Sequence, residues 1–472
     1  MRKLEKLVAL ILSVVMLCCM VSLASAEATA PEGYPEIIKD ADGKPIDLGG
    51  IEVIIADYWS ATDGTRNEAT DAKTEETYAY QDWLMETYNF TIKQCGVSDW
   101  AGNPEAFLNF ATSNGAENYI FMMRPDAVAT PMASGLLYDL GSLDCLDFTK
   151  TKWNSAVVSL MSKGASVYGT AVGASEPRQV IFFNKRLVEE AGIDPESIYD
   201  LQKNGEWTWD KYEELVAKCT RDTDNDGATD IYGMADFSMD FFMAAVASNN
   251  GTFFDVDENG QYVVTANSDE TLEALNWAQK MFTTYEMPQP SDDTNWDWFR
   301  AAFTSGKAAF FCDEAYQTNA NGLLSTMEDD FGMVCFPTGP KNEAGNYKTI
   351  SSENVVVMPS FYDADRAWKI AFAYNLFTND TPGYELELDP DAWKDNYYNL
   401  FRDERAVDET YATLRESSHT AAAVSRLFGS DNDVLGSDFI WSISGGAVTP
   451  AEAIETKMPA WQAYLDTMNS VG

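Results

Sequence analysis

Buried-type strands alternate with amphipathic helices along this chain. Mainly apolar runs predict strands at Ile51–Ile55, Tyr119–Met123 and Val180–Phe183, because strands covered on both faces need little polar alternation. A helical pattern at Glu75–Tyr88 and a further strand near Phe90–Gln94 separate the first two runs. This alternation predicts an α/β fold.

Helix boundaries are also readable around the third strand. The helix that follows Val180–Phe183 should stop at Gly192, since glycine tolerates the left-handed conformation common at helix ends. The next helix should start at Thr208 or Asp210, either of which can accept a capping hydrogen bond through its side-chain oxygen.

The first 26 residues predict an exported protein. A basic start at Arg2 and Lys3, an apolar run over residues 7–21 and Ala24-Ser25-Ala26 together form a secretory signal peptide, residues 1–26. The apolar run is too short for a membrane span, so we expect an extracellular, cell-surface or periplasmic protein. Residues 15–17, which precede Cys18 and Cys19, lack the small pair that lipidation needs. A lipid anchor is thus disfavoured and stays the alternative.

Charge and cysteine content exclude several classes of protein. The formal net charge is −43 at pH 7, which argues against binding of nucleic acid or other polyanions. Cleavage after Ala26 would leave five of the seven cysteines, an odd number at wide spacings. Neither a disulfide framework nor a CxxC metal site is indicated, and we expect mostly buried thiols.

Several motifs, in a fixed order, resemble one family. Asn184-Lys185 ends the third strand, and Trp-Thr-Trp-Asp at 207–210 opens a helix. Further segments of the same kind are Ser134–Leu140, Ala301–Phe310, Phe336–Pro340 and Pro459–Ala463. From residue 51 to residue 463 the chain resembles the extracellular solute-binding proteins, family 1, of carbohydrate ATP-binding-cassette (ABC) importers.

The resemblance implies a type II periplasmic-binding-protein fold, in which two α/β lobes are joined by hinge crossovers with a ligand cleft between them. The N-terminal lobe would comprise residues 27–172 plus 336–378, and the C-terminal lobe residues 178–335 plus 379–472. Glycines and small residues in Tyr168–Glu176 suit a hinge.

Candidate ligand-binding residues combine rings with polar groups, because a sugar offers an apolar C–H face and a hydroxyl edge. Most of these residues follow a predicted strand or lie in the first crossover. The alternative for each ring is a core position, and for each carboxylate a solvated one. The candidates are Tyr58, Trp59, Arg124, Glu176, Asp240, Asp313, Tyr316, Glu353 and Trp441.

An acidic loop resembles a calcium-binding loop in its spacing. Asp222, Asp224, Asp226 and Asp230 occupy positions one, three, five and nine, with glycine at position six, as in an EF-hand. Position twelve is Gly233, where an EF-hand has a bidentate glutamate. We expect no required cofactor and at most a structural calcium ion.

The resemblance implies that a monomer captures a sugar or oligosaccharide by lobe closure and delivers it to transmembrane permease subunits. Two alternatives stay open: a secreted glycoside hydrolase, which needs paired carboxylates, and a binding protein of the same fold for a peptide or other non-sugar solute. The only histidine, His419, suggests no Ser-His-Asp arrangement. No phosphate loop, zinc spacing or nicotinamide fingerprint is present, so we expect no enzyme.

Overall fold

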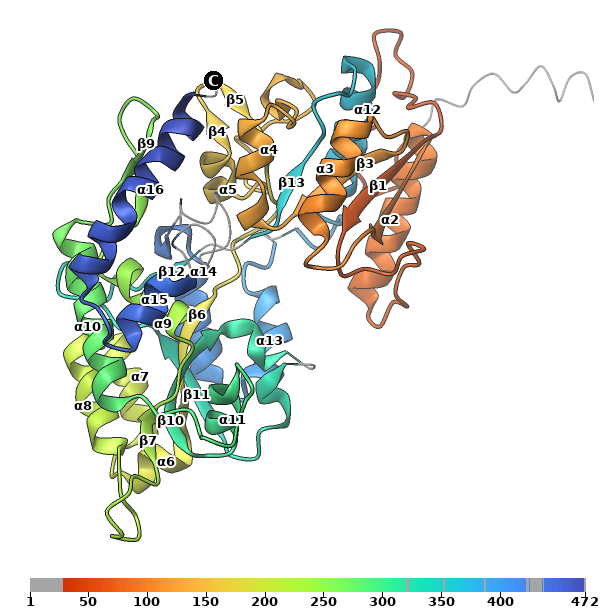
Figure 1. The fold of residues 1–472 in the computed structure, drawn as a ribbon. Helices are drawn as coiled ribbons and strands as arrows, with labels where there is room; N and C mark the ends of the chain where they lie inside the picture. Colours follow the sequence, from red (N-terminus) through yellow and green to blue (C-terminus); the bar gives the residue numbers. More distant parts are fainter. Residues whose placement is uncertain are drawn as a thin grey trace, which may run out of the picture.

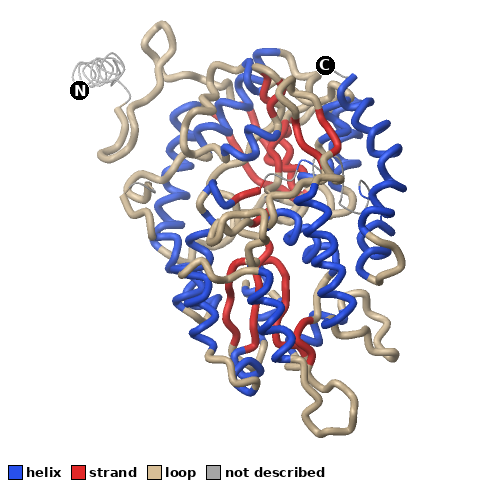
Figure 2. Tube along the Cα trace, turned by 90° about the vertical axis from the view of Figure 1, so that its left-hand side faces the viewer, coloured by secondary structure: helices blue, strands red, loops and turns tan. Residues whose placement is uncertain are grey.

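Two α/β bodies, each built on its own four-stranded sheet, make up the protein (Figure 1). The computed structural model describes residues 29–319, 322–350, 353–385, 388–421, 424, 435 and 437–470. The predicted signal peptide, residues 1–26, lies outside this range. Viewed from the side, the strands of one sheet lie above those of the other, with helices around both (Figure 2).

The first sheet, with its helices, forms the first lobe. Its strand order is β13-β3-β1-β2, where β1 pairs in parallel with β2 and β3 while β13 runs antiparallel to β3. The three strands predicted for this part of the chain are confirmed. The elements are β1 (Ile51–Asp57), β2 (Phe90–Gly96), β3 (Asn118–Met123), β13 (Val355–Val357), α2 (Ala72–Tyr88), α3 (Asn103–Ser113), α4 (Ala129–Ala133), α5 (Ser155–Leu160), β4 (Ser162–Lys163), β5 (Ser166–Val167) and α12 (Ala364–Phe377).

The second sheet has the order β11-β6-β10-β7 and forms the second lobe. Strand β6 runs antiparallel to both neighbours, and β7 is parallel to β10. All six residues of β6 are buried. The main elements are β6 (Gln179–Asn184), β7 (Tyr232–Met234), β10 (Ala308–Glu314), β11 (Phe331–Cys335), α6 (Lys185–Glu190), α7 (Pro195–Lys203), α8 (Trp209–Cys219), α9 (Ser238–Ser248), α10 (Asp269–Tyr285) and α11 (Trp298–Thr304).

The remaining elements complete the second lobe. The hairpin β8–β9 packs against α16, and β12 pairs in parallel with β14. They are β8 (Phe254–Val256), β9 (Tyr262–Val264), β12 (Thr349–Ile350), α13 (Asp395–Phe401), α14 (Ala412–Arg415), β14 (Thr420–Ala421), α15 (Ser437–Ser444) and α16 (Pro450–Ser470). No described helix is both long and apolar enough to cross a bilayer.

Local signals around β6 mostly agree with the prediction. Asn184 caps α6 by accepting from the Leu187 N–H at 3.1 Å, and Gly192 after that helix has φ +70°. Thr208 occupies the N-cap position of α8, but its side chain makes no capping hydrogen bond.

The five cysteines in the described part of the chain are free thiols, four of them buried and Cys145 half-buried.

The chain returns to the first lobe later than residue 336. The Thr338 N–H donates to the Trp207 carbonyl at 3.1 Å, and the Tyr347 hydroxyl donates to the Gln202 carbonyl at 2.7 Å. The Lys341 N–H likewise donates to Asn249 Oδ1. Residues 336–350 therefore belong with the second lobe, because its helix ends satisfy their backbone and side-chain polar groups, and the return falls between Ile350 and β13.

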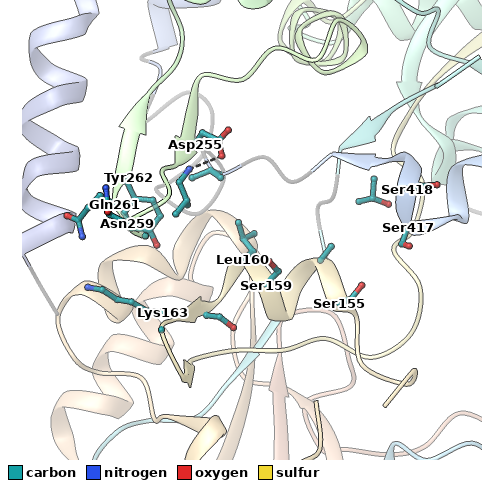
Figure 3. Close-up of a pocket in the computed structure, with 17 residues that line it drawn as sticks. Ser155, Ser159, Leu160, Lys163, Asp255, Asn259, Gln261, Tyr262, Ser417 and Ser418 are labelled. Atoms are coloured by element: carbon teal, nitrogen blue, oxygen red, sulfur yellow. Dashed lines mark hydrogen bonds between the residues drawn. The ribbon is translucent and has the colours of Figure 1, made fainter. Parts of the chain in front are cut away.

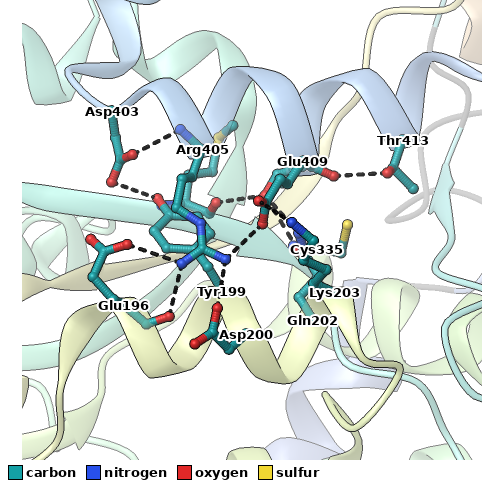
Figure 4. Close-up of polar contacts among 12 residues, drawn as sticks. Glu196, Tyr199, Asp200, Gln202, Lys203, Cys335, Asp403, Arg405, Glu409 and Thr413 are labelled. Carbon is teal, nitrogen blue, oxygen red and sulfur yellow. Dashed lines mark hydrogen bonds and ion pairs between the residues drawn. The ribbon is translucent and has the colours of Figure 1, made fainter.

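A polar network fastens residues 403–413 to the second lobe (Figure 4). The Arg405 guanidinium pairs with Glu196, Asp200 and Glu409 at 2.9–3.0 Å and lies over the Tyr199 ring, 4.9 Å from its centroid. Multidentate pairing of one arginine fixes α7 against the segment that leads to α14.

Two acidic residues, the buried Asp236 and the half-buried Glu286, lie together beside β7 and β10. The Asp236 N–H donates to Glu286 Oε1 at 2.8 Å, and Asp236 Oδ1 accepts from the Cys312 N–H. The second oxygen of each carboxyl group has no hydrogen-bond partner among the described residues. Burial raises the pKa of both groups well above the usual range; Asp313 and Asp240 raise the pKa of Asp236 further, and Asp236 raises that of Glu286. The folded protein therefore holds protons here that the unfolded chain releases.

This pair predicts that stability falls as pH rises. In the unfolded chain both groups lose their protons near pH 4. In the folded protein they keep their protons to higher pH. Their contribution to the free energy of unfolding is therefore full below pH 4 and is lost as the pH rises toward the folded-state pKa. The urea midpoint should therefore decrease from pH 5 to pH 8. Asp236→Asn keeps the acceptor for Cys312 and should flatten this dependence, whereas the exposed Glu258→Gln should leave it unchanged. An equally steep profile for Asp236→Asn would contradict the assignment.

Candidate functional site

The strand ends of both sheets carry predicted site residues. Tyr58 and Trp59 follow β1, Arg124 follows β3, and Tyr316 follows β10. In open α/β sheets, ligands bind outside the carboxyl ends of strands. These residues therefore lie at the edges where such a site is expected.

Arg178, which immediately precedes β6, joins the two edges. Its guanidinium lies 3.5 Å from Glu176 Oε2, 3.8 Å from Glu314 Oε2 and 5.6 Å from the centroid of the Tyr316 ring. Burial lowers the pKa of this group, but Glu314, Glu176 and Glu353 outweigh burial, and the pKa is raised. Arg178 thus carries a fixed positive charge among three carboxylates.

The backbone of Arg178 is held as firmly as its side chain. Its N–H donates to Thr349 Oγ1 at 2.8 Å, and its carbonyl accepts from the Ala315 N–H at 2.9 Å. Arg178 is not among the site residues predicted from the sequence. The one sequence feature that could have indicated its role is a lone cation directly after Glu176-Pro177 in a strongly acidic chain.

Glu353 and Tyr58 complete the group from the first lobe. Glu353 Oε1 accepts from the Glu176 N–H at 2.7 Å, and the Tyr58 hydroxyl donates to Asn354 Oδ1 at 2.8 Å. Burial raises the pKa of both Glu353 and Tyr58. We define the junction cluster as Tyr58, Glu176, Arg178, Glu314, Tyr316, Glu353 and Asn354.

Two further predicted residues lie beside the junction cluster on the first lobe. The Trp59 ring stands at 85° to Tyr58, with centroids 4.8 Å apart, and the residue is 50% exposed. Arg124 forms a bidentate pair with Asp126 and lies over the Trp100 ring. The cluster is thus flanked by an exposed ring and a paired cation.

Asp313 points into the second lobe. It is 2% exposed, lies 3.3 Å from Arg300 Nε and accepts from the Glu314 N–H. Burial raises its pKa to about 6, although Arg300 opposes this. The side chain of Asp313 is therefore too buried to contact a ligand. Its partner Arg300 is the more exposed of the two.

Asp240 and Trp441 lie apart from the junction cluster. Asp240 is half-buried on α9 and raises the pKa of Asp236. Trp441 is 55% exposed on α15, and no contact recorded for the described residues ties it to the cluster. Their ligand-binding roles remain predictions.

Two grooves run between the lobes near the crossover. One, of about 520 Å³, is lined by Lys152, Ser175 and Arg415 among others. A second, of about 690 Å³, lies between α5 and β4 of the first lobe and the β8–β9 hairpin of the second (Figure 3). Neither is lined by any of the nine predicted ligand-binding residues.

The acidic loop brings three of its four predicted ligands together. One carboxylate oxygen from each of Asp222, Asp224 and Asp226 lies within 4.8 Å of the others, and all three side chains are exposed. Asp230 instead accepts from the Thr223 N–H and hydroxyl at 2.7 and 2.6 Å. Three carboxylates suit calcium as part of a shell, and water or backbone carbonyls would have to supply the rest.

The arrangement suits binding of an uncharged polyhydroxylated molecule: rings offer stacking faces, and paired carboxylates, amides and a guanidinium offer hydrogen bonds. Two lobes with such groups where they meet define a binding protein. Residues 135–371, half of the chain, match the family of bacterial extracellular solute-binding proteins. The chain belongs to this family.

Solved structures support the fold over nearly the whole chain. The cyclic α-maltosyl-1,6-maltose binding protein from Arthrobacter globiformis shares 17% identity at a TM-score of 0.63, covering 88% of this chain and 99% of that one. UgpB from Mycobacterium tuberculosis, in complex with glycerophosphocholine, shares 16% identity at a TM-score of 0.58, with 87% and 98% covered. The type II periplasmic-binding-protein fold is confirmed.

One curated relative is similar in sequence. The arabinooligosaccharide-binding protein of Halalkalibacterium halodurans is 26% identical over 253 residues. The match covers 51% of this chain, which spans about half the length of that relative.

Removal of Arg178 should destabilise the junction. Arg178→Met leaves Glu176, Glu314 and Glu353 facing one another without a counter-charge, so the free energy of unfolding should fall by about 3 kcal/mol at pH 7. The loss should shrink at pH 5 as Glu353, whose pKa is raised by burial, gains a proton. Arg186→Met, which breaks a more exposed pair with Asp329, should cost about 1 kcal/mol or less. Equal losses for both variants in urea denaturation would contradict this role.

We propose that the acidic loop binds calcium and expect 1 mM Ca²⁺ to raise Tm by about 2 °C. The double variant Asp222→Asn/Asp224→Asn removes two of the three converging carboxylates and should abolish this gain in a thermal melt. A matched change at the exposed pair Asp255 and Asp257 on the β8–β9 hairpin should leave the gain intact. An identical Tm with chelator and with Ca²⁺ in the unsubstituted protein would rule out the site.

Proposed function

We propose that this protein is the exported substrate-binding component of an ABC importer, and that it captures a sugar or oligosaccharide between its lobes. The observation that carries the proposal is the junction cluster, in which rings and hydrogen-bonding groups from both sheets converge on Arg178. The name of the curated relative and the sugars named for similar structures support a carbohydrate as ligand.

Lobe closure provides the mechanism. Tyr58 and Trp59 belong to the first lobe, Glu314 and Tyr316 to the second, and Arg178 to the crossover between them. A ligand that contacts both lobes only when they are closed shifts the population toward the closed state. The closed monomer would then dock on transmembrane permease subunits and release the sugar for transport.

The ligand is bound and released unchanged. Glu176 and Glu314 both lie beside Arg178, and Glu353 accepts a backbone hydrogen bond, so the carboxylates nearest the rings already have structural partners. The three carboxylates around one cation also disfavour a phosphorylated or acidic ligand. A neutral sugar is therefore favoured over a non-sugar anion and over a hydrolysed substrate.

Calorimetry with a panel of mono- and oligosaccharides should detect binding in the micromolar range, and the radius of gyration should decrease at saturation. Tyr316→Ala removes a stacking ring and should weaken binding about tenfold. Tyr285→Ala, on α10 and paired with Glu213, should bind as the unsubstituted protein does.

Three outcomes would contradict the proposal. They are saccharide products on chromatography after incubation, a radius of gyration unchanged at saturation, and tight binding of peptides or phosphorylated solutes in place of sugars.

A further inference from the structure

The chain passes between the lobes three times, and the three crossovers are tied to one another on the first lobe. The first crossover follows β5 and leads into β6, the second leads from β12 to β13, and the third follows α12. The Thr170 N–H donates to the Val356 carbonyl at 3.0 Å, and the Val356 N–H donates to the Thr170 carbonyl at 2.7 Å. These two hydrogen bonds hold the start of the first crossover beside the end of the second.

Lys152 joins the first and third crossovers. Its carbonyl accepts from the Gly173 N–H, in the first crossover, at 2.8 Å. Its Nζ donates at the end of α12, where the third crossover begins, to the Asn375 carbonyl at 2.7 Å, to Asn379 Oδ1 at 2.8 Å and to Thr378 Oγ1 at 3.2 Å. A single residue therefore holds both segments on the first lobe.

Neighbouring contacts hold the same two segments. Asn154 Nδ2 donates to Ser175 Oγ, in the first crossover, at 3.0 Å. In the third crossover, Thr381 Oγ1 lies 2.7 Å from Thr77 Oγ1 on α2. The fixed part of each crossover thus extends to Ser175 and to Thr381. The next residue of the first crossover, Glu176, already belongs to the junction cluster.

Three oxygens face the end of the Lys152 side chain, and an ammonium group satisfies all of them. An ammonium carries three N–H donors, whereas a neutral amine carries two and a lone pair, which would face the third oxygen. The side chain is half-buried, with Nζ 4.5 Å from the centroid of the Trp153 ring. Burial lowers the pKa of Lys152 to about 7. The third hydrogen bond is therefore lost as the pH rises through neutrality.

The charged groups around Lys152 come from three segments. Lys150, in the same loop, lowers the pKa of Lys152 further, and Asp380, in the third crossover, raises it. Arg415 of α14 lines the same groove of about 520 Å³ as Lys152 and Asp380. Two of these three neighbours are cations, so the surroundings of Lys152 do not share the strongly negative charge of the chain as a whole.

We propose that Lys152 is a positioning residue for lobe closure: its ammonium group holds the starts of the first and third crossovers together, so that the lobes turn about the residues beyond them. This inference rests on the proposed function, in which lobe closure captures the ligand. Crossovers that are ordered before the ligand binds reduce the entropy cost of closure. Loss of one of the three hydrogen bonds frees the end of α12, raises that cost and weakens binding.

The affinity for sugar should therefore depend on pH through Lys152. Below pH 7 the ammonium is present and the affinity is full; the affinity should fall as the pH rises through 7, by about fivefold at pH 9. Because the protonated form then binds the ligand more tightly, binding at pH 7 should take up protons. Calorimetry in two buffers of different ionisation enthalpy measures this uptake.

Three variants separate this role from a general effect of pH on binding. Lys152→Arg keeps a cation at every pH and should show no fall in affinity between pH 6 and pH 9. Lys152→Met has no donor and should bind about fivefold more weakly than the unsubstituted protein at pH 6, again without a fall toward pH 9. Lys73→Met, which removes an exposed lysine of α2, is the matched control and should keep the full pH dependence.

Hydrogen exchange in the unliganded protein at pH 6 tests the crossovers without any sugar. Lys152→Met should exchange faster than the unsubstituted protein at residues 171–175 and 375–381, whereas Lys152→Arg should restore part of the protection. Strands β1 and β10 should exchange alike in all three proteins. A general loss of folding would speed exchange in these strands too and would appear in the thermal melt.

The same fall in affinity from pH 6 to pH 9 in both Lys152 variants as in the unsubstituted protein would overturn the role of Lys152 while the proposed function stands. Unchanged exchange at both crossovers in Lys152→Met would overturn it as well. Binding of no saccharide by the unsubstituted protein would contradict the proposed function, whereas the exchange experiment would still test the hold of Lys152 on the two crossovers.

Discussion

The positive charge of Arg178 is the constraint on which the junction between the lobes depends. Glu176, Glu314 and Glu353 come from the crossover, the end of β10 and the approach to β13, and in a chain of net charge −43 they would repel one another. The guanidinium lets these segments meet, and its backbone bonds to Thr349 and Ala315 fix where it stands. The guanidinium also lies 5.6 Å from the centroid of the Tyr316 ring, while Tyr58 is held by its hydrogen bond to Asn354.

The strand order places different kinds of side chain at different positions along each sheet. Charged and hydrogen-bonding groups gather where the chain crosses between lobes, while exposed rings lie toward the edge strands β2 and β7. The network around Arg405 and the late return of the chain after Ile350 add segments 336–350 and 403–413 to the second lobe. The second lobe is therefore larger than the sequence predicted.

Local signals in the sequence predicted the strands, the helix end at Gly192 and the positions of Tyr58 and Tyr316. A residue that follows a buried strand lies at the sheet edge whatever its distant neighbours are. Arg178 could not be predicted as a site residue because its partners Glu314 and Glu353 are remote in sequence. Asp313 was predicted to bind ligand, but β10 continues through Glu314. Alternation along the strand then turns Asp313 inward and Glu314 outward. The return of the chain to the first lobe was predicted at residue 336, which is too early. Backbone hydrogen bonds such as that from Thr338 to Trp207 hold this segment on the second lobe, and the sequence does not reveal them.

The lack of disulfides in the described chain has a consequence for the life of the protein outside the cell. Burial raises the pKa of the Cys145 and Cys219 thiols to about 12, so the thiolate that oxidants attack is scarce. Four of the five described cysteines are also buried, so oxidants have little access to those sulfur atoms. With every described cysteine free, no disulfide ties one lobe to the other.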